Sequence, residues 1–125
     1  MTKIYALVAL AFWLLQAVPA MAGNGDADKG ALIFRSKCMM CHMPDQNKVG
    51  PKLAGVVGRK AGTVAGYPYS PGLQGATFSW DAAHLDQWLA GPSAVVPGTK
   101  MTFKLDKPED RANAIAYLKT LSAPN

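Results

Sequence analysis

The stretch Cys38-Met39-Met40-Cys41-His42 decides how this chain is interpreted. Two thiols three residues apart lie on one face of a helical turn, so both can add to the vinyl groups of a single porphyrin. The histidine directly after them projects toward a metal at the centre of that ring, where imidazole is a common ligand of haem iron. The spacing therefore predicts one covalently bound haem c, attached through Cys38 and Cys41, with His42 as an axial ligand.

Three other chemistries use closely spaced cysteines. The pair can form a disulfide in an oxidising compartment. A thioredoxin-like Cys-x-x-Cys needs a βαβ context, and the sequence shows no such pattern. A structural zinc site takes about four protein ligands, whereas the chain offers only Cys38, Cys41, His42 and His84, two of them adjacent. We therefore favour haem attachment over a disulfide, a redox dithiol or zinc.

A second axial ligand must come from another part of the chain. Of the methionines after residue 22, those at 39, 40 and 43 lie in or beside the attachment segment. Met101 lies far along the chain, shortly after a Pro97-Gly98 turn, which holds the next residues in a fixed direction. Its polar loop is unlike the surroundings of a methionine that fills a core. Met101 is the favoured sixth ligand, and the rival is His84, which falls inside a helical pattern.

The first 22 residues have the layout of a secretory signal peptide. Lys3 precedes an apolar run over residues 4–18, and Pro19-Ala20-Met21-Ala22 contains a small-x-small cleavage site. The run is short for a membrane span, which needs about 20 residues. We expect cleavage after Ala22, which would leave residues 23–125 as one exported domain, a monomer with no stable membrane insertion.

Hydrophobic periodicity predicts helices and no strands, which is an all-α fold. The first helix runs from an Asp26 cap to about Lys37, and the second starts at Ser79 and ends before Gly91. The last helix begins with a capping box, Asp106-x-x-Glu109. Residues 43–79 contain seven Gly and four Pro, which is loop composition. A loop of that length is unusual in a compact domain, and a buried porphyrin would give it a surface to pack on.

With these features in place, the sequence resembles the class I cytochromes c, most closely mitochondrial cytochrome c and its bacterial periplasmic relatives. The resemblance spans nearly all of residues 23–125. Its pieces occur in the family's order: Cys38–His42, Gly50-Pro51, Gly58-Arg59-Lys60, Tyr67–Ser70, Trp80, Pro97–Phe103 and Ala116-Tyr117-Leu118-Lys119. It implies an all-α fold in which helices and Ω-loops surround one covalently bound haem.

The resemblance also implies residue roles. The Pro51 carbonyl would orient His42, Met101 would be the sixth ligand, and Phe103 would lie beside the exposed haem edge. A buried propionate would be hydrogen-bonded or neutralised by three further residues, Arg59, Tyr69 and Trp80. The first and last helices would cross at Gly30, Phe34 and Tyr117.

Two positions depart from the family's usual pattern. Trp88 stands where the family often has a tyrosine near the ligand sulfur, and Leu73 stands where it often has an asparagine. Tryptophan donates through its N–H only, and leucine donates nothing. The polar network behind Met101 is therefore expected to differ from the family's.

These features imply a soluble periplasmic electron carrier with one haem, not an enzyme, because His and Met ligands together fill both axial positions of the iron. The alternatives are an electron-accepting subunit of a periplasmic dehydrogenase, or a small haem peroxidase or gas-binding cytochrome if Met101 is not a ligand. The expected donor is a quinol–cytochrome c reductase, and the expected acceptor is an oxidase, a photosynthetic reaction centre or a reductase.

Charge fits a docking role. The chain carries a net charge of +5, and no nucleic-acid recognition motif accompanies it. Residues 35–60 hold six basic side chains against Asp45 alone, and Lys100, Lys104 and Lys107 lie near Met101. A positive rim around the haem edge would steer the protein toward partners with acidic docking surfaces.

Overall fold

The computed structural model describes residues 24–122, so the predicted signal peptide, 1–22, lies outside the described residues. The elements in chain order are α1 (Ala27–Ile33), η1 (Phe34–Cys38), α2 (Pro71–Gln74), α3 (Ala82–Ala90), α4 (Pro92–Val95) and α5 (Pro108–Thr120). Within the described part of the chain, strand pairing is limited to an isolated antiparallel bridge between Lys60 and Ser79. The predicted all-α fold is confirmed.

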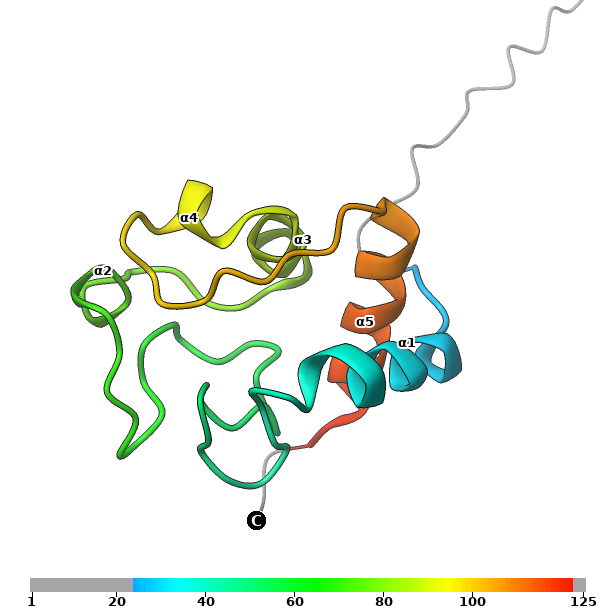
Figure 1. Ribbon diagram of the computed structural model, residues 1–125, viewed down its shortest axis with the longest axis horizontal. Coiled ribbons are helices and arrows are strands. Elements are labelled where there is room, and N and C mark those ends of the chain that lie inside the picture. Colours follow the sequence, from blue (N-terminus) through cyan, green and yellow to red (C-terminus); the bar gives the residue numbers. More distant parts are fainter. Residues whose placement is uncertain (1–23, 123–125) are drawn as a thin grey trace, which may run out of the picture.

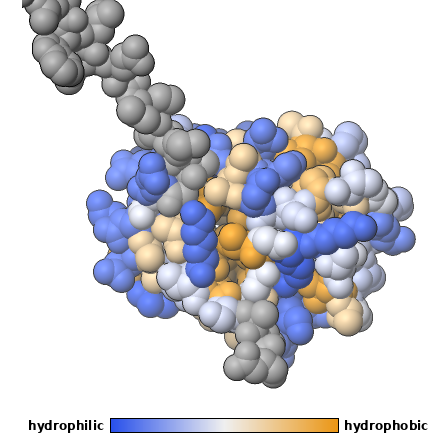
Figure 2. All heavy atoms as spheres, turned by 180° about the vertical axis from the view of Figure 1, so that it is seen from behind, coloured by the Kyte–Doolittle hydropathy of each residue, from blue (hydrophilic) through white to orange (hydrophobic). Residues whose placement is uncertain are grey.

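Figure 1 shows how the helices are arranged around the loops. Helices α1 and α5 pack together on one side, α2 and α4 lie on the far side, and α3 lies between. The loops that come after η1 fill the region below α3 and beside α1 in this view. On the face shown in Figure 2, hydrophilic side chains cover most of the surface, and hydrophobic atoms show in smaller areas between them.

The first helix changes its winding just before the attachment segment. The Asp26 side chain caps α1 as predicted, accepting from the backbone N–H groups of Asp28 at 2.8 Å and Lys29 at 3.2 Å. At Phe34 the helix widens into η1, where the Met39 N–H donates to the Phe34 carbonyl at 3.0 Å. Such π turns are rare and often occur at functional sites. Here the wide turn delivers the chain to the two cysteines.

Helices α1 and α5 cross where glycine permits it. A Cβ on Gly30 would lie 1.9 Å from the Asn113 carbonyl oxygen and 2.8 Å from the Tyr117 Cβ. One turn later the rings of Phe34 and Tyr117 pack with centroids 5.1 Å apart. The Asn113 side chain adds a polar link, because its Oδ1 accepts from the Asp26 N–H at 2.8 Å. The predicted crossing of the first and last helices is confirmed.

The second predicted helix starts later than expected. Its N-cap is Asp81, whose carboxylate accepts from the His84 N–H at 2.8 Å. Ser79 is instead in the bridge with Lys60, and this pairing continues as Trp80 N–H donates to the Arg59 carbonyl at 2.8 Å. Because Ser79 and Trp80 both take part in this extended pairing, α3 begins only at Ala82, and the predicted start at Ser79 was wrong by three residues.

The predicted capping box of the last helix is also wrong. Helix α5 begins at Pro108, and its N-cap residue is Lys107, without a side-chain cap. The residue before a proline is disfavoured in helical conformation, and Lys107 has φ −83° and ψ 123°, which is extended. Asp106 contributes its backbone instead, since its carbonyl accepts from Arg111 Nη1 at 2.9 Å.

Two short helices were not predicted. Both α2 and α4 have four residues and begin with a proline at the first helical position, where its missing N–H costs nothing. Helix α2 lies inside the segment expected to be loop throughout, and it is capped by Ser70, whose hydroxyl accepts from the Leu73 N–H at 3.4 Å. Single turns of this kind are too short for hydrophobic periodicity to reveal.

Replacement of Gly30 by alanine is expected to lower the free energy of unfolding. Helix propensity alone favours alanine by about 1 kcal/mol. The added methyl group would overlap the backbone of α5, which cannot rotate away as a side chain can, so we expect a cost at the upper end of the ~1–3 kcal/mol usual for overpacking. Denaturant unfolding of the haem-loaded protein measures the net effect, with Ser36→Ala on the exposed side of the same helical segment as the control. A Gly30→Ala variant as stable as the parent would contradict the proposed packing.

Candidate haem site

A cavity of about 420 Å³ lies among α3, α5, the attachment segment and the loops. Its volume is in the range of cofactor sites, ~300–1,000 Å³. Apolar and aromatic side chains form most of its wall, among them Leu73, Leu85 and Leu89. The cavity also brings together all nine residues that the sequence singled out for haem binding, which are Cys38, Cys41, His42, Pro51, Arg59, Tyr69, Trp80, Met101 and Phe103.

The attachment segment forms one turn at the cavity wall. The N–H groups of Cys41 and His42 both donate to the Cys38 carbonyl, at 3.1 and 2.9 Å. Cys38 and Cys41 are not joined by a disulfide, so the structure does not support the disulfide interpretation. Cys38 is half-buried, and burial raises the pKa of its thiol to about 11, whereas Cys41 is exposed. Both thiols face the same cavity, as attachment to one porphyrin requires.

His42 is held by a backbone carbonyl. Its Nδ1 lies 2.8 Å from the Pro51 oxygen, and since that oxygen can only accept, Nδ1 carries the proton and Nε2 is left to bind a metal. Burial lowers the pKa of His42 below its ordinary value, the Arg59 charge lowers it further, and the Pro51 bond opposes both. The imidazole is therefore kept in the neutral form that ligates iron.

Met101 is held by the indole of α3. Trp88 Nε1 donates to the Met101 sulfur at 3.1 Å. The ring of Trp88 is buried and packs edge-on against Trp80, with centroids 5.0 Å apart. A thioether sulfur is a weak acceptor, so the bond chiefly orients the side chain. Trp88, which stands where the family often has a tyrosine, thus still supplies a hydrogen-bond donor to this sulfur.

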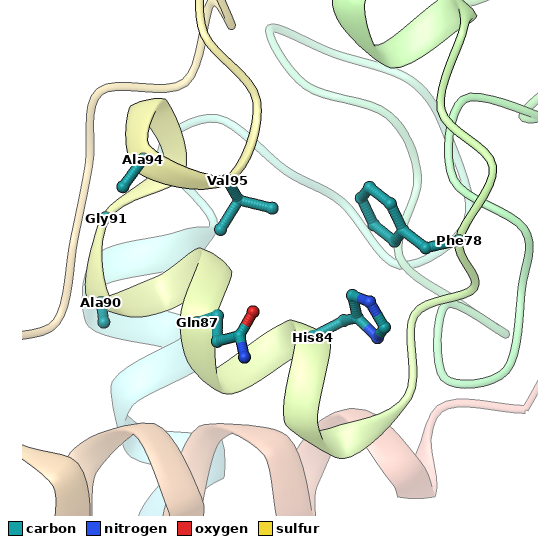
Figure 3. A pocket seen from close by; sticks show the side chains of 7 residues that line it. All are labelled: Phe78, His84, Gln87, Ala90, Gly91, Ala94 and Val95. Atoms are coloured by element: carbon teal, nitrogen blue, oxygen red, sulfur yellow. The ribbon is translucent and has the colours of Figure 1, made fainter.

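The rival ligand, His84, lies outside the cavity. It lines a separate surface hollow together with Phe78, Gln87 and Val95, and Figure 3 shows its ring below that of Phe78, on the side of α3 that faces this hollow. The two rings are stacked, with centroids 4.8 Å apart and planes within 2°. His84 Nδ1 also bonds to the Asp81 carboxylate at 2.8 Å. These contacts give His84 a structural role in starting α3.

Three residues expected near a propionate line the cavity as well. The half-buried Arg59 guanidinium donates to the Lys52 carbonyl at 2.9 Å and the Ala54 carbonyl at 3.3 Å. Burial lowers its pKa, although the nearby Tyr69 opposes the shift. The Tyr69 hydroxyl accepts from the Val64 N–H at 3.1 Å and keeps its own hydrogen to donate. Trp80 is buried beside them.

Comparison with known proteins gives the family. Residues 27–122 match the family model "Cytochrome c". A cytochrome c of Nigella damascena is 42% identical over 106 residues, covering 82% of this chain and 96% of that protein. Cytochrome cH from Methylobacterium extorquens superposes with a TM-score of 0.73 at 47% identity, covering 77% of this chain and 99% of the other. Ferricytochrome c2 from Rhodopseudomonas palustris superposes with a TM-score of 0.72 at 43% identity, covering 78% of this chain and 99% of the other.

The chain belongs to the class I cytochromes c. Members of this family are electron carriers that hold one covalent haem c with its iron, and this chain therefore has the same cofactor. Its residues fit that group, because one apolar cavity collects two thiols, an imidazole and a thioether. Zinc has no comparable site, since no three His, Cys, Asp or Glu side chains gather as metal ligands within residues 24–122.

This cytochrome also contains a contact that its sequence did not reveal. Lys100 Nζ donates to the Pro68 carbonyl at 2.7 Å, across 32 residues of sequence. The ammonium of Lys100 thereby fastens the loop that carries Met101 to the loop that carries Tyr69. The sequence offered Lys100 only as a docking charge, because nothing in the pattern shows which distant carbonyl a lysine reaches.

Replacement of Trp88 by phenylalanine tests the bond to the Met101 sulfur. The substitution keeps an aromatic ring against Trp80 and removes the N–H, which should lower the free energy of unfolding by about 1 kcal/mol. If Met101 is the sixth ligand, as the sequence predicts, the variant should also have a lower reduction potential, because the indole no longer withdraws electron density from the sulfur. Voltammetry measures the potential. Equal potentials in the parent and in Trp88→Phe would show that the indole N–H does not act on the sulfur.

Proposed function

We propose that this cytochrome is an exported, periplasmic carrier of single electrons, with its iron bound between His42 and Met101. The observation that supports the proposal is the single apolar cavity that both ligands line together with Cys38 and Cys41. Met101 lies in the segment between α4 and α5, and His42 lies in the loop after η1. The two ligands thus approach the cavity from different segments of the chain.

Two protein ligands leave the iron no open position for a substrate, so this chain acts as a carrier and not as an enzyme. The bound haem supplies a one-electron couple whose potential a methionine ligand raises. The chain's own residues hold the cofactor, keep water from it and keep the His42 imidazole neutral. Arg59, Tyr69 and Trp80 offer hydrogen-bond donors to a propionate, and Phe103 lines the cavity next to the Met101 loop.

Export is supported by the layout of residues 1–22, which ends in a small-x-small cleavage site. Among the helices of the described residues, none has the length and apolar character needed to cross a membrane. We infer that cleavage after Ala22 releases a single domain, residues 23–125, into the periplasm.

The mouth of the cavity has the composition of a docking surface. Met40 and Val49 line the cavity and are 73% and 67% exposed, and Lys37 and Lys100 line it as well. An apolar centre with a charged rim is the usual anatomy of a protein interface. We infer that partners with acidic docking surfaces bind here, a quinol–cytochrome c reductase as donor and an oxidase, reaction centre or reductase as acceptor.

Mass and visible spectra test the ligation. The purified protein should have the mass of residues 23–125 plus one haem that acid-acetone does not extract. Its oxidised form should show the weak sulfur-to-iron band in the far red, and Met101→Ala should abolish that band because the sulfur is lost. His84→Ala is the control and should leave the band unchanged. An extractable haem, or a band that survives Met101→Ala, would falsify the assignment.

Salt dependence and charge reversal test the docking face. Salt screens exposed charges over about 8 Å at physiological ionic strength, so the rate of electron transfer to a membrane oxidase should fall steeply as salt rises. Lys37→Glu at the cavity mouth should lower this rate more than Lys119→Glu on the exposed end of α5, because rim charges chiefly set the association rate. Lys100 is a poorer probe, since its substitution also breaks the bond to Pro68. Equal effects of the two reversals would rule out this face as the docking site.

A further inference from the structure

Gly50 is buried next to the axial histidine and its backbone is tied on both sides. Its N–H donates to the Cys41 carbonyl at 2.8 Å, and its carbonyl accepts from the Lys48 N–H at 2.9 Å. The glycines with positive φ among residues 24–122 are Gly55, Gly58, Gly62, Gly66 and Gly98. Gly50 is not one of them, so its backbone conformation does not by itself require glycine.

The His42 ring is what excludes a side chain at this position. A Cβ on Gly50 would lie 2.3 Å from His42 Cε1 and 2.7 Å from both ring nitrogens. Nearly equal distances to these three atoms place that point over the face of the ring, since a point in the ring plane beyond Cε1 would lie farther from the nitrogens. The bare backbone of Gly50 therefore packs on one face of the imidazole.

We propose that Gly50 is a positioning residue, which fixes the plane of the imidazole that binds the iron; this inference rests on the proposed role of His42. The ring has two torsional freedoms, and two contacts from adjacent residues restrict them. The Pro51 carbonyl accepts from Nδ1 at 2.8 Å, which sets the direction of the ring edge. Gly50 lies against the face and prevents the ring from tilting toward the loop.

A methyl group at residue 50 cannot be accommodated by a simple shift of the loop. The loop cannot move away without breaking the bond between the Gly50 N–H and the Cys41 carbonyl, and Cys41 is itself anchored by the haem in the loaded protein. The ring of His42 must then rotate or tilt while its Nε2 stays near the iron. The angle between the imidazole plane and the porphyrin nitrogens changes as a result, and partners of a metal-bound histidine that set its orientation also tune the metal.

The experiment compares Gly50→Ala with Gly75→Ala in the oxidised, haem-loaded protein. Gly75 has φ −90°, and a Cβ there would meet its nearest atoms at 3.7 and 4.0 Å, so the same chemical change fits without a clash. Proton NMR of the four haem methyl groups reports the imidazole plane, because their hyperfine shifts depend on its angle to the porphyrin. We expect the order or spread of these shifts to change in Gly50→Ala and to match the parent in Gly75→Ala, with the far-red sulfur band present in both. Shifts in Gly50→Ala equal to those of the parent would overturn the proposal.

A measurement on the parent protein covers the case in which Gly50→Ala yields no haem-loaded protein. The geometry requires a strong nuclear Overhauser effect between the Gly50 α protons and the His42 Cε1 proton in the reduced, diamagnetic state. Its absence would overturn the proposal. A parent protein without the far-red sulfur band would instead count against the His42/Met101 ligation, so the two ideas fail by different observations.

Discussion

The crossing of α1 and α5 at Gly30 is the contact on which the rest of the structure depends. With no side chain on Gly30, the two helices approach until a Cβ there would lie 1.9 Å from the Asn113 carbonyl oxygen. From this contact α1 leads through the wide turn of η1 to Cys38, so the crossing sets the position of the cysteine through which we propose that the haem is attached. On the other helix, Arg111 bonds to the Asp86 carboxylate at 2.8 Å and so ties α5 to α3, which carries Trp88. The positions of both walls of the cavity therefore depend on the packing of α1 against α5.

The sequence predicted the chemistry of the site better than the path of the backbone. A five-residue motif was enough to name the haem and the residues Cys38, Cys41 and His42, and the polar loop favoured Met101. The family likeness added five further residues, and the cavity collects all nine. Helix boundaries were less predictable, since Ser79 and Asp106 are both good capping residues by type. The structure uses neither as a cap, because Ser79 is engaged by Lys60 and because Pro108 keeps Lys107 extended. Local propensity is overridden at Ser79 by a backbone pairing from another segment, and at Asp106 by the proline two residues later.

What the sequence could not show are contacts whose partners lie far apart in the chain. The sequence predicts a docking charge at Lys100, beside the proposed ligand Met101, and only the fold shows that its ammonium reaches the Pro68 carbonyl. Gly50 is a second case at shorter range, because it follows His42 by eight residues and no pattern in the sequence shows that its backbone packs on that ring. The reason for the glycine is the face of the His42 ring rather than the backbone, and that becomes visible only when both segments are placed. The spacing of residues along the chain does not predict such a contact.

The two proposed axial ligands, His42 and Met101, are supported in different ways. His42 belongs to a short closed loop, because the Pro51 carbonyl that orients it is nine residues away and the covalent attachment is adjacent. Met101 depends on tertiary structure, since its sulfur bonds to Trp88 on α3 and its loop is fastened through Lys100 to Pro68, 32 residues away. A local unfolding that separates α3 or the Pro68 loop from the Met101 loop would break the contacts that hold the Met101 sulfur. The contact between His42 and Pro51 would remain. The position of the Met101 sulfur therefore depends on contacts from α3 and from the Pro68 loop, whereas His42 is positioned within residues 38–51, the segment that also holds both cysteines.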